Sequence, residues 1–198
     1  MHLKRTILTV DEANNTRIAM ATTIDTAFEA FAAVLTPSSS ETTAAASHRE
    51  SVYNKLNAAF GVSSFFRTGS TGNSTGVRFH SDVDYFASIP VLNQRSDSAY
   101  MLQKVKDALQ ERFPFTDIHI STPAVVCNFG SDSAERIEVV PAYYVNQSNS
   151  SNVYKIPVVG GGWTESSPTI HNAYVSSIND NLNKKVKPLV RFIKAIKY

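Results

Sequence analysis

Cysteine and tryptophan are scarce in this chain. Its 198 residues include one cysteine, Cys127, and one tryptophan. A single cysteine cannot form an internal disulfide, which fits a reducing cytoplasm. Cys127 lies in the apolar run 124–129, whereas reactive cysteines need an electropositive setting. We therefore predict a buried cysteine side chain that packs in the core and is not a nucleophile.

Charge and long hydrophobic runs are also scarce. Charged residues make up 18% of the chain and the net charge is +2, so we expect no extensive nucleic-acid binding. No stretch approaches the run of about 18 apolar residues that a membrane helix needs. Residues 1–20 lack the apolar core of a signal peptide. These absences predict a cytoplasmic protein without membrane contact.

The length indicates a single domain with a hydrophobic core. Apolar residues recur at helical spacing over 16–35 and again before Gly61, which predicts two helices within residues 1–60. Strand patterns fall within 61–160, and helical patterns return within 161–198. A sheet between helical ends indicates an α+β or α/β domain.

The same patterns predict individual elements. Polar composition predicts a surface loop over residues 146–152, and three glycines, 160–162, precede Trp163. Expected strands are Ser63–Thr68, Val83–Pro90, Asp117–Ser121, Ala124–Phe129, Arg136–Ala142 and a short apolar segment at Tyr154–Val159; expected helices are Ser98–Phe113, Pro168–Asn181 and Lys185–Tyr198.

The most informative stretch is a glycine turn followed by two acids. Gly69 and Ser70 end the first expected strand, and Asp82 and Asp84 begin the next. Side chains on a strand alternate sides, so Asp82 and Asp84 point the same way. Two carboxylates held together repel unless a cation such as Mg²⁺ binds them. The glycine turn suits phosphate, because the backbone can approach closely and donate its amides.

A third carboxylate would complete a two-metal site, and Glu138 is the candidate. It lies in an otherwise apolar strand, residues 136–142. Two interpretations stay open: Glu138 joins the acidic pair, or it faces solvent on an edge strand and pairs with a lysine. The loop 71–76 has the composition of a flexible linker, but we interpret it as part of the site.

Other residues have a functional and a plain interpretation. Trp163 could stack a base, although a packing role is commoner. His80 could contact phosphate, although a solvated loop histidine is commoner. On the last helix, Lys187, Arg191 and Lys194 form a basic stripe at helical spacing that could be a solvated face or a nucleic-acid contact.

Taken together, these motifs resemble the polymerase β-like nucleotidyltransferases. Gly69-Ser70, eleven residues, Asp82-x-Asp84 and a later acid reproduce the order of that superfamily. Within it, the chain is most similar to the bacterial cGAS/DncV-like enzymes (CD-NTases). The segments that carry this closer likeness are 81–84, 138–142, the Trp163…Pro168…His171 segment, and 189–195, which resembles the helix with a triphosphate-contacting lysine.

The resemblance implies an α+β fold, with a mixed sheet flanked by helices, in a single catalytic domain over 1–198. It implies that Asp82, Asp84 and Glu138 hold two Mg²⁺, or Mn²⁺ in their place, during transfer from nucleoside triphosphates. Gly69, Ser70 and Lys194 would bind the donor nucleotide. The implied products are cyclic or short linear oligonucleotide messengers in antiphage signalling.

Two features differ from that family. The third acid is Glu138, where the family usually has aspartate, and the family continues past the lysine helix into a helical domain that is largely absent from these 198 residues. We therefore expect a homodimer or a partner protein to complete the acceptor pocket. Two alternatives stay open: transfer of one nucleotide to a protein, RNA end or small molecule, and a non-catalytic nucleotide-binding module.

Overall fold

The computed structural model describes residues 23–36, 39–78, 82–130, 135–148 and 151–197. The chain forms two compact units, Met1–Val34 and Leu35–Tyr198. In the first unit, helix α1 (Ile24–Val34) has no buried residue. The helix expected over 16–35 is therefore confirmed from Ile24 onward, and residues 16–22 lie outside the described residues.

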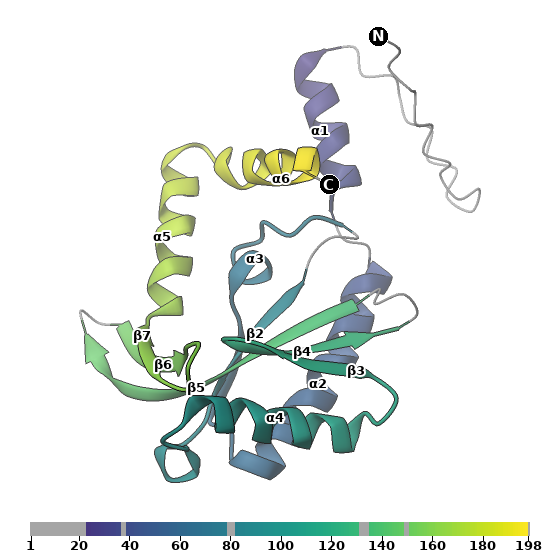
Figure 1. Ribbon diagram of the computed structural model, residues 1–198. Coiled ribbons are helices and arrows are strands. Elements are labelled where there is room, and N and C mark those ends of the chain that lie inside the picture. The colour runs from purple at the N-terminus through teal and green to yellow at the C-terminus, as the bar shows by residue number, and fades with distance from the viewer. Residues whose placement is uncertain (1–22, 37–38, 79–81, 131–134, 149–150, 198) are drawn as a thin grey trace. The chain divides into compact units, whose positions relative to one another are not determined.

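The second unit is built on a mixed seven-stranded sheet (Figure 1). Its strand order is β1-β2-β5-β4-β3, with β6 paired to β5 and β7 paired to β6. Strands β2 and β5 run parallel, whereas β1–β2, β3–β4, β4–β5, β5–β6 and β6–β7 are antiparallel. The bounds are β1 Ser64–Arg67, β2 Val83–Ser88, β3 Asp117–Ser121, β4 Ala124–Phe129, β5 Glu135–Ser148, β6 Ser151–Pro157 and β7 Trp163–Ser166.

Two helices, α2 (Ser39–Phe60) and α4 (Ser98–Arg112), cover one face of this sheet (Figure 1). The Asp97 carboxylate caps α4 by accepting from the amides of Ala99 and Tyr100. The helices bury an apolar stripe against the inward side chains of the strands. The core includes Val52, Leu56, Met101, Leu102, Val105, Leu109, Tyr85, Val125, Cys127, Ile137 and Val139.

The opposite face carries the residues that alternate with this core. It has only a small apolar cluster around Phe86, Ala142 and Tyr154, formed by strands β2, β5 and β6. Because side chains alternate along a strand, Asp84 and Glu138 lie on this less covered face. Helix α3 (Gly69–Gly72), a single turn, follows β1 directly.

The C-terminal helices α5 (Pro168–Asn181) and α6 (Val186–Lys197) follow the sheet. Helix α6 directs its basic stripe toward the protein, where Arg191 donates to the Ser74 carbonyl and Lys194 to the Thr75 carbonyl. Its apolar stripe faces outward: Leu189, Ile193 and Ile196 are 55%, 60% and 84% exposed. The interpretation of the basic stripe as a solvated face is therefore wrong.

Most expected strands and helices are confirmed, but the prediction of a loop over residues 146–152 is wrong, and strand β7 was not predicted. Residues 146–148 extend β5, and residues 151–152 begin β6; they pair with each other in an antiparallel hairpin. Residues 163–166 form β7, which pairs with β6. Both segments are polar and short, and backbone pairing with a neighbouring strand makes them extended. A 3₁₀ turn at Val91–Asn93 completes the elements.

Within the described ranges, no helix combines the length and apolar composition needed to cross a bilayer.

Replacement of Leu109 by alanine tests the core beneath the site. Leu109 is 0% exposed, and its truncation should lower the free energy of unfolding by about 2–5 kcal/mol in urea titrations. The matched control is Leu92→Ala, because Leu92 is 95% exposed and its loss should cost less than about 0.5 kcal/mol. Equal effects of the two changes would contradict the assigned core.

Candidate active site

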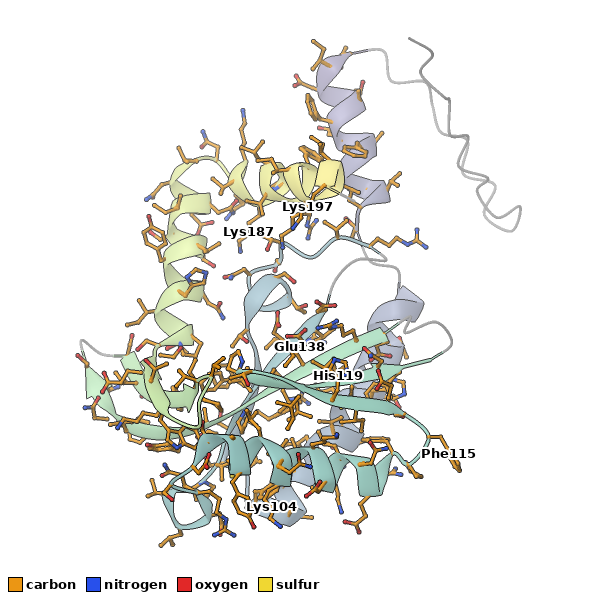
Figure 2. The ribbon with its side chains drawn as sticks, in the orientation of Figure 1. Lys104, Phe115, His119, Glu138, Lys187 and Lys197 are labelled. Atoms are coloured by element: carbon orange, nitrogen blue, oxygen red, sulfur yellow. The ribbon has the colours of Figure 1, made fainter. Side chains whose placement is uncertain are left out.

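The acidic residues meet where β2 and β5 run side by side. Asp84 and Glu138 are direct register partners in this parallel pair. Asp82 lies two residues before Asp84, and its backbone carbonyl accepts a hydrogen bond from the Thr71 hydroxyl at 3.0 Å. Figure 2 labels Glu138 on the sheet, below α3 in that view. The strand β5 is internal, between β2 and β4, so the interpretation of Glu138 as an edge-strand residue is wrong.

The glycine turn contacts the second acid directly. Gly69 has a φ of +55°, and a Cβ built there would lie 1.9 Å from Asp84 Oδ2. The Ser70 amide donates to the Asp84 carboxylate, and the Thr68 amide donates to the Asp84 carbonyl at 2.9 Å. Position 69 thus requires glycine for two reasons: its backbone φ is positive, and a side chain there would collide with Asp84.

Like charge and burial raise the pKa values of both aspartates. The Asp84 pKa rises from 3.8 to about 6, mainly because burial removes water and then because Glu138 and Asp82 repel its charge. The Ser70 amide and Lys194 act in the opposite direction. Burial also raises the pKa of Asp82, and Arg136 partly offsets this rise. Burial and repulsion between the carboxylates therefore both disfavour full ionisation of the acidic group.

Arg136 is the cation closest to these carboxylates that the structure identifies. Its Nε lies 2.9 Å from Glu138 Oε1 and 3.5 Å from Asp82 Oδ1, and its Nη2 also donates to Glu138. The hydrogen bonds to Glu138 raise the pKa of the guanidinium further. Sequence reasoning missed this residue, although its position two before Glu138 places both on one face of β5.

Lys194 reaches the same region from the far end of the chain. Its Nζ donates to the Thr75 carbonyl at 3.3 Å, and its charge acts on Asp84. Thr75 in turn donates its amide to the Ser70 carbonyl at 2.8 Å. The loop 71–76 is therefore held between the glycine turn and α6, as the interpretation of this loop as part of the site requires.

Carboxylate oxygens are the donors that Mg²⁺ prefers, so the chemistry of the acidic group fits this metal. The arrangement is less complete: in the parts of the chain that the structure describes, no three His, Cys, Asp or Glu side chains are gathered to hold a metal ion. Glu138 is instead engaged by Arg136. Loading the site would require this carboxylate to turn toward Asp84.

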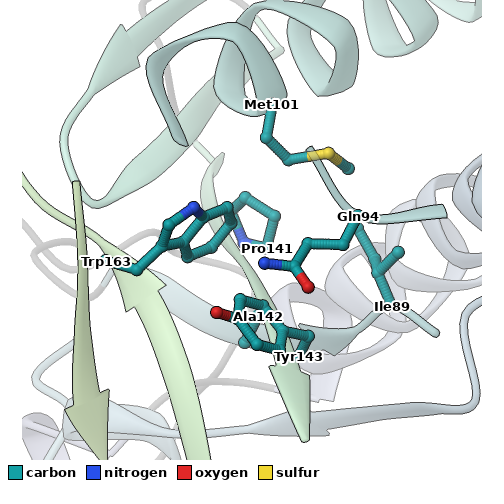
Figure 3. Close-up of a pocket in the computed structure, with 7 residues that line it drawn as sticks. All are labelled: Ile89, Gln94, Met101, Pro141, Ala142, Tyr143 and Trp163. Carbon is teal, nitrogen blue, oxygen red and sulfur yellow. The ribbon is translucent and has the colours of Figure 1, made fainter. Parts of the chain in front are cut away.

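Trp163 and Cys127 have structural roles. Trp163 donates its indole N–H to the Ser96 carbonyl at 3.0 Å and packs edge-to-face on Tyr143. Figure 3 shows Trp163 beside Pro141 in a small hollow that has no room for a water molecule. Burial raises the pKa of Cys127 to about 12, so it is a thiol at neutral pH, as predicted. His80 lies outside the described residues.

This fold, with acids on adjacent strands beside a glycine turn, is that of the polymerase β-like nucleotidyltransferases. Residues 22–179 match the family model described as the Second Messenger Oligonucleotide or Dinucleotide Synthetase domain, and the chain belongs to this family. The resemblance to the CD-NTases found from the sequence is thereby confirmed. No curated protein matches the chain.

Solved CD-NTase structures share the fold at low sequence identity. The CdnE cyclic dinucleotide synthase of Elizabethkingia meningoseptica, with GTP and Apcpp, is 20% identical with a TM-score of 0.63, covering 77% of this chain and 58% of its own. The E. coli MS115-1 CdnC:HORMA-deltaN complex is 19% identical with a TM-score of 0.61, covering 85% and 55%. Vibrio cholerae DncV cyclic AMP-GMP synthase, in complex with the linear intermediate 5' pppA(3',5')pG, is 16% identical with a TM-score of 0.52. This match covers 67% of this chain and 38% of DncV. The chain thus spans roughly half of these proteins.

Replacement of Gly69 by alanine tests the contact between the glycine turn and Asp84. The new methyl group would displace the Asp84 carboxylate, so we expect a loss of about 2–4 kcal/mol in the free energy of unfolding, from backbone strain and overpacking. Gly61→Ala is the matched control: its φ is +66°, but its Cβ would meet no atom closer than 3.6 Å. It should cost about 1–2 kcal/mol in the same urea titration. Equal losses would show that Gly69 does not contact Asp84 closely.

Replacement of Asp84 by asparagine should stabilise the metal-free protein at neutral pH. The folded pKa of about 6 lies above the unperturbed 3.8, so stability falls as pH rises between these values, and the full penalty applies above pH 6. Asparagine removes this charge and still accepts from the Ser70 amide. With allowance for screening at a half-buried group, we expect about 1 kcal/mol, or about 2–4 °C in Tm at pH 7.5 in EDTA.

The gain in Tm should shrink as the pH is lowered toward 4. The control is Asp180→Asn, because Lys184 lowers the pKa of this exposed carboxyl and its neutralisation should not raise Tm. A Tm for Asp84→Asn at or below that of the wild type would show that Asp84 carries no electrostatic penalty.

Proposed function

We propose that this chain is the catalytic part of a synthase that makes cyclic or short linear oligonucleotide second messengers from nucleoside triphosphates. The observation that carries the proposal is the register pair Asp84–Glu138, of which Asp84 is in direct contact with the glycine turn. Membership of a second-messenger synthetase family supports the same reaction class. A role in bacterial antiphage signalling and a cytoplasmic location belong to this proposal.

The donor nucleotide would bind with its phosphates over the glycine turn. Gly69 allows close approach of the triphosphate to the backbone, and Ser70 offers a hydroxyl beside it. Lys194 lies near enough to act on Asp84, so its ammonium group can also neutralise phosphate oxygens of a nucleotide held there. These three residues would orient the α-phosphate toward the acids.

Asp82, Asp84 and Glu138 would hold the metal ions. Two Mg²⁺, when bound, would activate the attacking hydroxyl and stabilise the pyrophosphate that leaves. The raised pKa values of Asp82 and Asp84 are consistent with a group built to bind cations, since a cation lowers the cost of keeping both ionised. Mn²⁺, a metal that carboxylate ligands also suit, could replace Mg²⁺.

The acceptor half of the site is proposed to come from outside the described residues. The matched region covers only 58% and 55% of two solved relatives, and the apolar stripe of α6 is exposed. Additional groups would come from a further segment, a second copy or a partner protein packed on Leu189, Ile193 and Ile196. They would lie beside the loop 71–76, because α6 contacts this loop. One CdnC relative forms a complex with HORMA-deltaN.

Incubation with labelled NTPs and Mg²⁺ or Mn²⁺, followed by phosphatase, tests the proposed function. A small phosphatase-resistant product is expected. Asp82→Asn and Asp84→Asn should each lower pyrophosphate release at least about a hundredfold, because each removes a metal ligand. Glu138→Gln should do the same, whereas Glu138→Asp should keep activity, since aspartate preserves the charge.

Asp180→Asn is the control for loss of an aspartate elsewhere and should leave pyrophosphate release unchanged. Label transferred to a macromolecule would support the alternative of single-nucleotide transfer. Pyrophosphate release from the wild type that is no greater than from Asp84→Asn would contradict both transferase functions and leave a nucleotide-binding module.

A further inference from the structure

We propose that the Arg136 guanidinium is the internal counter-ion of the acidic site and competes with the divalent metal for Glu138. This inference rests on the proposed two-metal function. Arg136 would be a positioning residue that holds the metal-free arrangement and must release Glu138 when the site is loaded.

The geometry of Arg136 supports this role. Two of its nitrogens, Nε and Nη2, donate to one oxygen of Glu138, and Nε also faces Asp82 at 3.5 Å. All three carboxylates act on its charge. A guanidinium so placed supplies the positive charge that the acids need when no metal is present.

The same contacts explain why the acids are not gathered around one point. Asp84 and Glu138 are register partners, so their Cα atoms lie on neighbouring strands with both side chains on one face. Glu138 nevertheless accepts hydrogen bonds from Arg136, two residues before it on the same strand. Because a carboxylate oxygen that accepts two guanidinium hydrogen bonds is poorly available to a metal, loading requires this bond to open.

Lys194 does not replace Arg136 in this role. Its Nζ lies 3.3 Å from the Thr75 carbonyl, in the loop 71–76, and its charge lowers the pKa of Asp84. The two cations therefore have different positions: Lys194 lies on the side where the phosphates are expected, and Arg136 contacts Glu138 and Asp82, which are proposed metal ligands.

The test is Mn²⁺ binding to the full 198-residue chain, measured from the EPR signal of free Mn²⁺ without nucleotide. Arg136→Gln should bind Mn²⁺ about tenfold more tightly than the wild type, because the ion no longer displaces a bound cation. Arg136→Lys keeps the charge and should stay within about threefold of the wild type. Unchanged or weaker Mn²⁺ binding by Arg136→Gln overturns the proposal, as does equal tightening by Arg136→Lys.

Arg112→Gln controls for the change in net charge. Arg112 lies over the Phe113 ring at the end of α4, and its loss should leave Mn²⁺ affinity as in the wild type. Tightening by Arg112→Gln equal to that of Arg136→Gln would overturn the proposal, because any lost positive charge would then suffice.

A second measurement uses the unaltered protein and does not depend on the folding of a variant. The Nε–H resonance of Arg136, assigned by ¹⁵N NMR, should shift when Mg²⁺ is added, since its bond to Glu138 is lost. The Arg112 resonance should stay in place. An Arg136 resonance that remains unchanged at saturating Mg²⁺ overturns the proposal.

The outcomes separate this inference from the proposed function. Mn²⁺ binding by the wild type that Asp84→Asn abolishes, without tightening in Arg136→Gln, overturns only the role of Arg136. Failure of both the wild type and Arg136→Gln to bind Mn²⁺ overturns both proposals.

Discussion

The parallel pairing of β2 with β5 is the constraint on which the site depends. It sets Asp84 opposite Glu138 and so holds two carboxylates on neighbouring strands of one sheet. Ionisation of Asp84 here costs free energy: burial, and then repulsion from Glu138 and Asp82, raise its pKa to about 6. The fold tolerates this cost because the buried apolar core on the other face of the same strands stabilises the pairing.

One face of the sheet packs in the hydrophobic core, and the other carries the acidic residues of the candidate site. Tyr85, Ile137 and Val139 point toward α2 and α4 and are fully buried. Their immediate neighbours in sequence, Asp84 and Glu138, point the other way. A shift of one residue in the register of either strand would place carboxylates in the core and apolar groups in the site. The core packing therefore fixes the position of the acids.

Helix α6 contacts the loop that follows the glycine turn and leaves an apolar stripe exposed. Arg191 donates to the Ser74 carbonyl and Lys194 to the Thr75 carbonyl, both in the loop 71–76. The apolar side chains of Leu189, Ile193 and Ile196 face outward. A surface helix of an isolated domain usually has the opposite arrangement, with its apolar stripe buried. Helix α6 instead leaves this stripe exposed and directs its basic residues to the loop 71–76.

The sequence by itself determined the features that depend on local spacing. These include the helices near α2, α4 and α5, the strands β2 to β4, and the common face of Asp82 and Asp84, because periodicity and alternation are properties of consecutive residues. Only the tertiary structure decided that residues 146–148 and 163–166 are strands, that Arg136 bonds Glu138, and that α6 turns its basic stripe inward. The contacts of α6 depend on Ser74 and Thr75, which are distant in the chain. The two strand segments and the Arg136–Glu138 bond join residues closer in sequence, but periodicity alone does not specify which of these groups will pair.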